Sequence, residues 1–201
     1  MDDIVRQAMA KWPNVPHCYG WLGLDARGGW YMRDDRAQAA GPFAGQDGAT
    51  LQSRGSLLKH DKLIEFIQRN YDHDAQGQWF FQNGPQRVYV ELEATPWVWR
   101  LDTGGEGVGR APVVTSHTGV PARPQRCVLD EAGRLYLETD LGFGLVHTLD
   151  MGLAAEAVEA ALVAALRIGL PDLDHGVAAG RAVAIGDAAG KGDSLAAREA
   201  G

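Results

Sequence analysis

The chain has 201 residues, 45% of them hydrophobic and 22% charged, and a formal net charge of −7. This length is sufficient for one large domain or two small ones with a buried core. The negative charge argues against a general nucleic-acid binder and against a protein that binds anionic membranes, since both functions need a basic surface. The net negative charge is still compatible with a small anionic ligand that binds to a local group of Lys and Arg side chains.

We expect a cytoplasmic protein. The first residues, Met1-Asp2-Asp3, are acidic and no apolar stretch follows them, which argues against a signal peptide. No apolar run approaches the roughly 18 residues that indicate a transmembrane helix. Cys18 and Cys127 lie far apart without a Cys-x-x-Cys pair, so neither a zinc knuckle nor a disulfide framework is indicated.

The N-terminal part of the sequence predicts two helices and one β-hairpin. Apolar residues at helical spacing favour a helix over residues 2–12 and a second over residues 57–71. Ser56 and Asp61 are both candidates for the N-cap of the second helix. Between the helices we expect a hairpin with arms at residues 19–24 and 29–33, then a Gly-rich loop over residues 41–55.

From residue 78 onward the pattern changes to short runs of aromatic and β-branched residues. It predicts seven strands, over residues 78–82, 87–93, 97–101, 112–116, 126–129, 135–138 and 144–149. A glycine-rich turn is expected over residues 103–109. An Ala-rich helix over residues 151–168 follows the strands, and the chain after Pro171 has the composition of a poorly ordered tail.

Seven short strands followed by one helix is the element order of a pleckstrin-homology-like barrel. We therefore expect an α+β fold with a small N-terminal domain of hairpin and helix over residues 1–76. A seven-stranded pleckstrin-homology-like β-barrel with a C-terminal helix would occupy residues 77–170, and a disordered tail residues 171–201. Fold by itself does not determine function.

One short phrase occurs three times in the chain. Asp-x-x-Gly, followed by a variable residue, a large apolar residue and an aromatic residue, begins at Asp25, Asp74 and Asp130. The Asp side chain can accept hydrogen bonds from the backbone two residues ahead, and the Gly supplies a positive φ. Each phrase therefore predicts the tip of a β-hairpin. The first hairpin and helix echo the third hairpin and helix, which suggests a duplication whose seam is the place to look for function. The middle tip is expected to open the barrel.

Several motifs resemble an uncharacterised bacterial family known as domain of unknown function twelve-eighty-five. They are Gly29-Trp30-Tyr31, Gly55-Ser56-Leu57-Leu58-Lys59-His60, Trp79-Phe80-Phe81, Arg87-Val88-Tyr89-Val90-Glu91, Glu93-Ala94-Thr95-Pro96-Trp97 and Leu135-Tyr136-Leu137-Glu138-Thr139-Asp140. The resemblance implies a duplicated core with a pleckstrin-homology-like second half. It also implies a pocket between the halves for a nucleotide-type ligand in a signalling role. The family tends toward Thr-Pro-x-Glu-Lys where this chain has Asn83-Gly84-Pro85-Gln86-Arg87, which suggests a different pocket chemistry or a sister family.

The sequence indicates no catalytic residue, metal site or cofactor. It contains no His-Glu-x-x-His, nucleophile elbow or phosphate-binding loop. The stretch Asp72-His73-Asp74 faintly resembles a calcium loop, but the hairpin tip already accounts for Asp74. The glycines at residues 104–109 are followed by Ala111-Pro112 rather than by a helix that would hold a pyrophosphate.

The most informative polar residues form a predicted cationic cluster. Arg54, Lys59, His60 and Lys62 surround a predicted helix start, whose free N–H groups favour anions, and Arg87 lies on the facing strand. The predicted ligand-binding site consists of Arg54, Lys59, His60 and Arg87 together with the aromatic Tyr89 and Trp97. An ordinary solvated helix end is the alternative interpretation of the same charges.

Three functional hypotheses follow. The first is a non-enzymatic binding module for an anionic or nucleotide-like ligand at the junction of the two halves. The second is a protein–protein interaction adaptor that uses the edge around residues 111–116 or the acidic face of strand 87–93. The third is a hydrolase that uses His60 and Asp61, which nothing in the spacing demands. A protein partner and the oligomeric state are not indicated.

Overall fold

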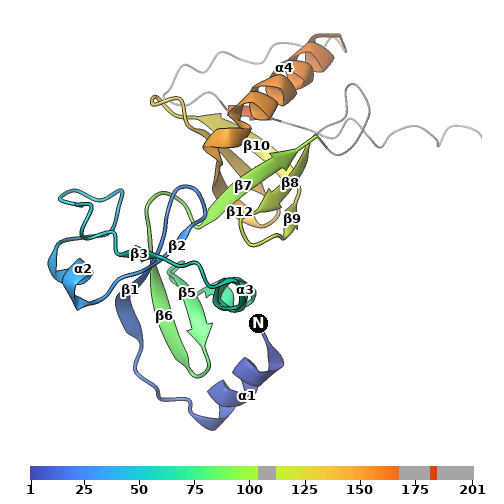
Figure 1. The fold of residues 1–201 in the computed structure, drawn as a ribbon. Helices are drawn as coiled ribbons and strands as arrows, with labels where there is room; N and C mark the ends of the chain where they lie inside the picture. Colours follow the sequence, from blue (N-terminus) through green and yellow to red (C-terminus); the bar gives the residue numbers. More distant parts are fainter. Residues whose placement is uncertain (104–111, 168–181, 185–201) are drawn as a thin grey trace, which may run out of the picture.

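The computed structural model describes residues 1–103, 112–167 and 182–184 of the chain (Figure 1). They form a mixed α+β fold with two β-sheets, each of which has its own apolar core. Among these residues, no helix is both long and apolar enough to cross a membrane. The turn expected at residues 104–109 and most of the expected tail lie outside the described residues.

The helices are α1 (Asp3–Lys11), α2 (Asp35–Ala39), α3 (Asp61–Arg69) and α4 (Met151–Arg167), with a 3-10 turn at Thr148–Asp150 before α4. The first sheet contains β1 (Cys18–Leu24), β2 (Trp30–Met32), β3 (Ser56–Leu57), β4 (Tyr71–His73), β5 (Trp79–Asn83) and β6 (Gln86–Leu92). The second contains β7 (Trp97–Asp102), β8 (Val113–Ser116), β9 (Pro121–Ala122), β10 (Pro124–Leu129), β11 (Leu135–Thr139), β12 (Gly142–Val146) and β13 (Ala182–Ala184).

All three Asp-x-x-Gly phrases are hairpin tips, as predicted, and they share one hydrogen-bond pattern. In each tip the Gly N–H donates to the Asp carbonyl, and Asp Oδ1 accepts two further backbone N–H groups. Gly28, Gly77 and Gly133 have φ values of 82°, 78° and 76°. Only glycine adopts this conformation without strain, so the geometry of the turn explains why a glycine recurs at this position in all three phrases.

The first sheet has the order β3-β2-β1-β6-β5-β4, with a parallel β1·β6 pair at its centre. One face of this sheet packs on α3, where Leu22, Trp30 and Phe81 bury against Ile67. The helix begins later than predicted, and neither Ser56 nor Asp61 is its N-cap. Ser56 is part of β3, and the His60 side chain accepts a hydrogen bond from the N–H of Leu63.

The predicted membership of the barrel was wrong. Strands β5 and β6 were expected to open it, but they pair with β4 and β1 in the first sheet. The middle tip at Asp74 consequently joins two strands of the first sheet, and a boundary after residue 76 would separate those paired strands. The error has a physical origin: alternation shows that a strand exists, whereas its partner is decided by contacts far away in the sequence.

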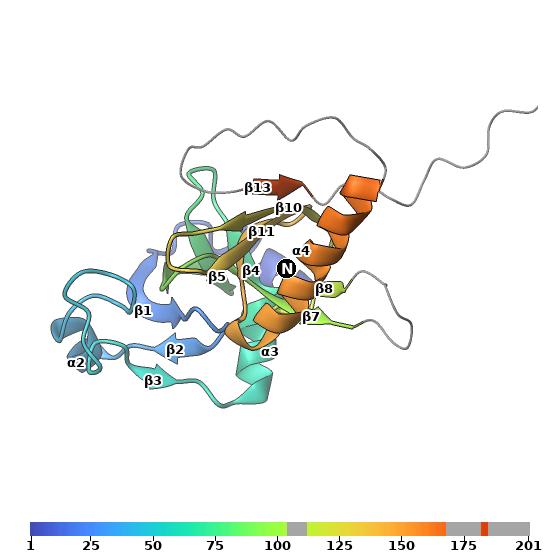
Figure 2. The same ribbon diagram turned by 90° about the horizontal axis from the view of Figure 1, so that it is seen from above.

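The second sheet curls on itself. Its order is β13-β10-β11-β12-β7-β8-β9. Strands β7 to β12 follow one another along the chain as a meander, and only Arg123 separates β9 from β10. The chain therefore passes directly from β9, at one end of the sheet, to β10, near the other end. A parallel pair between β12 and β7 joins the last strand of the meander to the first. In Figure 2, β13 lies beside β10 on the side away from β11.

Helix α4 covers the core of the second sheet. Ala154 is buried in that core with Trp99, Val114 and Leu137, while Leu153 and other partly buried side chains of α4 pack at its margin. Figure 1 shows α4 at the opposite end of the molecule from α1. The helix predicted over residues 151–168 is confirmed as far as Arg167; residue 168 lies outside the described part.

A buried arginine holds the loop that follows β2. The Arg33 guanidinium donates to the carbonyl oxygens of Ser53 at 2.8 Å and Gly41 at 2.6 Å and forms an ion pair with Glu91 of β6. It is 2% exposed, with Phe43 also fully buried nearby. Arg33 therefore fastens residues 34–55 to the face of the first sheet opposite α3. The sequence had indicated residues 41–55 of this segment only as a loop.

Aromatic side chains fill the seam between the two sheets. The ring of His117, after β8, lies 5.7 Å from that of Trp30, 5.9 Å from that of Tyr71 and 5.9 Å from that of Trp97, measured between centroids. Gln68 of α3 also donates from Nε2 to the carbonyl oxygen of His117 at 3.0 Å. The Tyr71 hydroxyl adds a hydrogen bond to the carbonyl oxygen of Pro96, directly before β7, at 3.1 Å, so the seam is a packed junction.

Candidate ligand-binding site

Alternation along the β5–β6 hairpin presents polar and aromatic side chains on the face away from α3. Phe81 and Val88 point into the core beneath α3, so their neighbours in the strands point outward. Gln82 pairs with Arg87 in register, and Phe80 pairs with Tyr89. The Arg87 guanidinium carbon lies 4.5 Å from the centroid of the Phe80 ring.

A hollow of about 310 Å³ opens at the end of this face, between α1 and the tip of the β5–β6 hairpin. Its lining is Met9, Trp12, Pro13, Val15, His17, Gln82, Pro85 and Arg87. We call it the Arg87 hollow. Helix α1 ends at Lys11 and Pro13 prevents its continuation, so the chain turns along the hairpin. Gln86 donates from Nε2 to the carbonyl oxygen of Pro16 at 3.0 Å and secures that segment.

Arg87 brings a positive charge to this hollow, and the same charge helps to lower the pKa of the nearby Asp74 carboxyl. Across the residues that the structure describes, no carboxylate oxygen lies within 4.0 Å of the Arg87 guanidinium, whereas Arg33, Arg54 and Arg100 all form such pairs. Lys11 adds a second cation, with Nζ 4.5 Å from the centroid of the Trp12 ring. The hollow can thus attract an anion with a forked donor and a nearby ammonium group.

Aromatic rings border the same hollow. Trp12 is 51% exposed, and the His17 ring lies edge-on to Tyr89 with centroids 5.7 Å apart. Tyr89 stacks on Tyr19 at 4.6 Å, with the two rings inclined by only 2°. The Tyr89 hydroxyl donates to Asp74 Oδ2 at 3.0 Å, which fixes its orientation. Trp12 and His17 are therefore the rings that a planar ligand can contact in this hollow, while Tyr89 supports His17 from behind.

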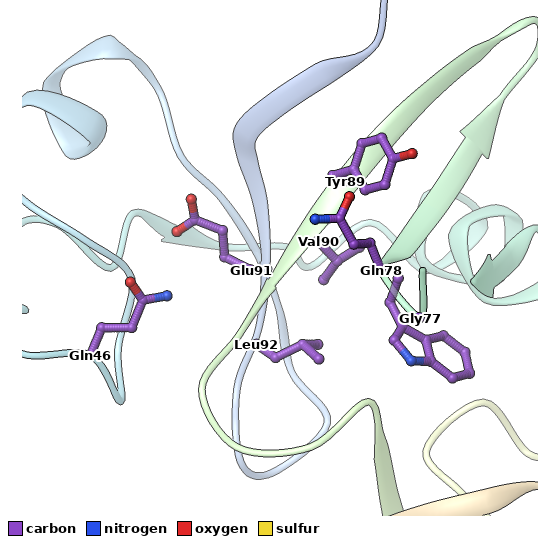
Figure 3. A pocket seen from close by; sticks show the side chains of 8 residues that line it. Gln46, Gly77, Gln78, Tyr89, Val90, Glu91 and Leu92 are labelled. Atoms are coloured by element: carbon purple, nitrogen blue, oxygen red, sulfur yellow. The ribbon is translucent and has the colours of Figure 1, made fainter. Parts of the chain in front are cut away.

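A second hollow, of about 350 Å³, lies on the same sheet near the loop that Arg33 holds (Figure 3). Gln46, Gln78, Tyr89 and Glu91 are among its lining side chains, and no Lys or Arg is in the lining. Figure 3 shows Glu91 and Gln46 facing it from different segments. Glu91 is already paired with Arg33. This hollow consequently offers no cation to an anionic ligand.

The predicted cationic cluster does not gather at one point. Arg54 pairs with Asp25 at 2.9 Å and Glu93 at 3.3 Å and lies over the Tyr31 ring, so it fastens the first hairpin tip. Glu93 and Arg87 stand six positions apart along the same extended segment, which corresponds to about 20 Å. Arg54 and Arg87 therefore lie at opposite ends of β6.

The remaining predicted residues occupy three different places. Lys59 and His60 are exposed at the start of α3, where His60 is the N-cap. Trp97 is in the seam, and its Nε1 donates to the carbonyl oxygen of Leu141 at 2.9 Å. Tyr89 is on the same face of β6 as Arg87, but it lines the second hollow and not the Arg87 hollow. The residues that sequence reasoning missed are Trp12 and Gln82, because only the folded chain brings α1 against the hairpin.

The Arg87 hollow offers a ligand one guanidinium group and the rings of Trp12 and His17. His17 and Arg87 are the only ionisable side chains in its lining. Within residues 1–103, 112–167 and 182–184, no three His, Cys, Asp or Glu side chains gather in a way that would hold a metal ion. Fold and site together define an α+β protein of two sheets with a cationic, aromatic hollow on the first.

The chain belongs to an uncharacterised family. The model of the family DUF2944, described as "Protein of unknown function (DUF2946)", matches residues 1–189. The expectation of an uncharacterised family is thus confirmed, but the matching family differs from the one suggested by the short motifs.

Two solved structures are similar to this chain. A DUF1285 family protein from Silicibacter pomeroyi DSS-3 has 13% sequence identity and a TM-score of 0.47, and the match covers 78% of this chain and 84% of that one. A DUF1285 family protein from Shewanella baltica OS155 has 13% identity and a TM-score of 0.44, with 68% and 91% covered. No curated protein matches the chain.

Proposed function

We propose that the protein is a non-enzymatic binding module for a small anionic, nucleotide-like ligand, and that the ligand binds in the Arg87 hollow. The observation that carries the proposal is the Arg87 guanidinium, which lines the hollow without a carboxylate partner within 4.0 Å among the described residues. The buried Arg33 and the partly buried Arg54 both have such partners.

Charge and shape support this choice of ligand. A guanidinium binds a phosphate through two parallel hydrogen bonds, and Lys11 adds a point charge nearby. Trp12 and His17 offer ring surfaces on which a base can stack. A volume of about 310 Å³ is at the lower end of the range for small-molecule sites. Because the chain as a whole carries a charge of −7, attraction of an anion has to be local.

Two finer proposals accompany this one. A signalling role is the role that the sequence resemblance implied for such a module. A pleckstrin-homology-like second half is supported by the curled sheet followed by α4, although the parallel β7·β12 pair is a departure from a simple antiparallel meander. Under either of these two proposals, the ligand would bind on the first sheet and not at the seam between the two sheets.

The test is a titration of the full chain with adenosine nucleotides, guanosine nucleotides and inorganic phosphate. Binding is measured by calorimetry and by the shift in melting temperature. Binding should raise the melting temperature in proportion to the logarithm of ligand excess. Arg87→Gln should weaken binding about 10- to 100-fold, since a charge-assisted hydrogen bond contributes about 1.5–3 kcal/mol. Arg123→Gln is the matched control, because Arg123 is exposed and lies between β9 and β10, outside the lining of the hollow. Absence of stabilisation by every compound would refute the proposal.

An adaptor function is the second candidate, and exposed aromatic residues on β1 favour it. Tyr19 is 58% exposed and Trp21 is 42% exposed. The surfaces first considered are less suitable: β8 pairs on both sides, and the acidic residues of the β6 segment pair with Arg33 and Arg54. A stoichiometric partner that co-purifies with Arg87→Gln but not with Tyr19→Ser would favour the adaptor.

A further inference from the structure

Gln82 stands out among the residues that line the Arg87 hollow. Its side chain is fully buried, and Oε1 has no hydrogen-bond partner within the part of the chain that the structure describes. Buried side-chain oxygens in native proteins nearly always accept a hydrogen bond from protein or water. An unpartnered acceptor in the wall of a hollow therefore points to a donor that arrives with a ligand.

The orientation of this acceptor is fixed by its neighbours. The Gln82 side-chain Nε2 donates to the carbonyl oxygen of Gly84 at 2.9 Å, and the backbone N–H donates to the carbonyl oxygen of Asn70 at 2.8 Å. Turning the amide by 180° would present Oε1 to the Gly84 carbonyl and lose that bond. The oxygen is thus the end of the amide that stays without a hydrogen-bond partner among the described residues.

We propose that Gln82 is a specificity-determining residue of the hollow, and that its Oε1 accepts a hydrogen bond from the exocyclic amino group of a nucleobase. This inference rests on the proposed function. The phosphate would bind Arg87, while the base lies beside Trp12 and His17 with its amino group toward Gln82. Bases that lack a donor at that position leave Oε1 unpartnered and bind more weakly.

The ligand gains access to Gln82 by displacing a lining side chain, because Oε1 has no surface in contact with water. Trp12 is the lining group with most freedom to move, since it is half exposed and follows the last residue of α1. The tryptophan fluorescence of the chain, to which Trp12 contributes as one of six tryptophans, should consequently change when a ligand binds, and this signal does not depend on the heat of binding.

The experiment compares two ligands that differ in one group. Adenosine 5′-monophosphate and purine riboside 5′-monophosphate share the phosphate, the sugar and the ring system, and only the former has the amino group. We expect the full-length wild-type chain to bind adenosine 5′-monophosphate about tenfold more tightly, which corresponds to about 1.4 kcal/mol. In Gln82→Met, which keeps a side chain of similar length without an acceptor, the two affinities should become equal.

Each outcome separates this inference from the proposed function. If neither compound binds the wild-type chain, the proposed function fails and the inference fails with it. If both bind the wild-type chain equally, the hollow is a nucleotide site and the role of Gln82 is refuted, even when the variant does not fold. If the preference for the amino group persists in Gln82→Met, another residue reads it and the inference is wrong.

Discussion

Gly28 lies so close to His117 that a Cβ atom on Gly28 would be 2.7 Å from the Cβ of His117. The first hairpin tip therefore abuts the second sheet without space for a side chain. Of the three tips, this one has two independent reasons for its glycine: the positive φ that it shares with the other two and the close approach of the seam. Of the three Asp-x-x-Gly tips, the one at Asp25 therefore also forms part of the contact between the two sheets.

Gly28→Ala should destabilise the protein more than Gly133→Ala. Both substitutions force a residue with a Cβ into positive φ, at a cost of about 1–2 kcal/mol. Nothing lies within 4 Å of a Cβ on Gly133, whereas Gly28→Ala adds overpacking against His117, typically about 1–3 kcal/mol more. Chemical denaturation of both variants measures the difference. Equal losses would mean that the seam yields without cost.

The protein should lose stability between pH 6.5 and pH 3 partly through His117. Burial lowers the pKa of His117 to about 3, compared with an ordinary value of 6.5. Below pH 6.5 the unfolded chain binds a proton that the folded chain does not, so protonation favours unfolding as the pH falls. The free energy of unfolding of His117→Gln should show a shallower slope in this interval, by up to about 1.4 kcal/mol per pH unit. Parallel slopes would contradict the assignment.

Arg33→Lys should release the loop over residues 34–55. A lysine has one ammonium group and cannot reproduce the forked contacts to Ser53, Gly41 and Glu91. Leaving buried carbonyls and a carboxylate unpartnered costs about 2–5 kcal/mol. Chymotrypsin should then cleave after Phe43, which is buried in the native chain. Arg126→Lys, at an exposed ion pair with Glu138, should leave the rate of cleavage unchanged.

Asp150→Asn should weaken the attachment of α4. Burial would raise the pKa of Asp150, but hydrogen bonds from Arg100 and from the N–H of Leu101 outweigh it and lower the pKa below 3.8. The ionised carboxylate therefore stabilises the fold above its ordinary pKa, and the benefit disappears as the pH falls through the lowered value. At pH 7 the substitution should cost about 1–3 kcal/mol. Glu138→Gln, at the exposed pair with Arg126, should cost less than about 1 kcal/mol.

The hairpin tips could be predicted from the sequence, whereas the pairing of strands that are distant in the sequence could not. The three tips followed from Asp and Gly alone because their hydrogen bonds stay within five residues. The assignment of β5 and β6 to the second sheet was wrong because β6 pairs with β1. The sequence of residues 86–92 contains no signal that indicates residues 18–24 as the neighbouring strand. Helix α2 was missed because its five residues are too few to show a period.

The candidate site shows the same division. Arg54 and Arg87 were both identified as cations, yet their roles diverge because Asp25 and Glu93 reach only Arg54. An arginine in a hairpin arm normally suggests a solvent-exposed charge, so Arg33 gave no signal of its buried contacts. Trp12 and Gln82 are distant in sequence, and only the return of the hairpin to the end of α1 brings them into one wall.

The two parallel pairs set the order in which the molecule can be assembled during translation. Val88 must leave the ribosome before Cys18 finds its partner, and Gly144 before Trp97 does. Until then the central strand of each sheet has an unoccupied hydrogen-bonding edge. Such long-range closure slows folding, because a large loop must be ordered before the contact is rewarded. Nascent chains that stop short of residue 88 should therefore depend most on chaperones.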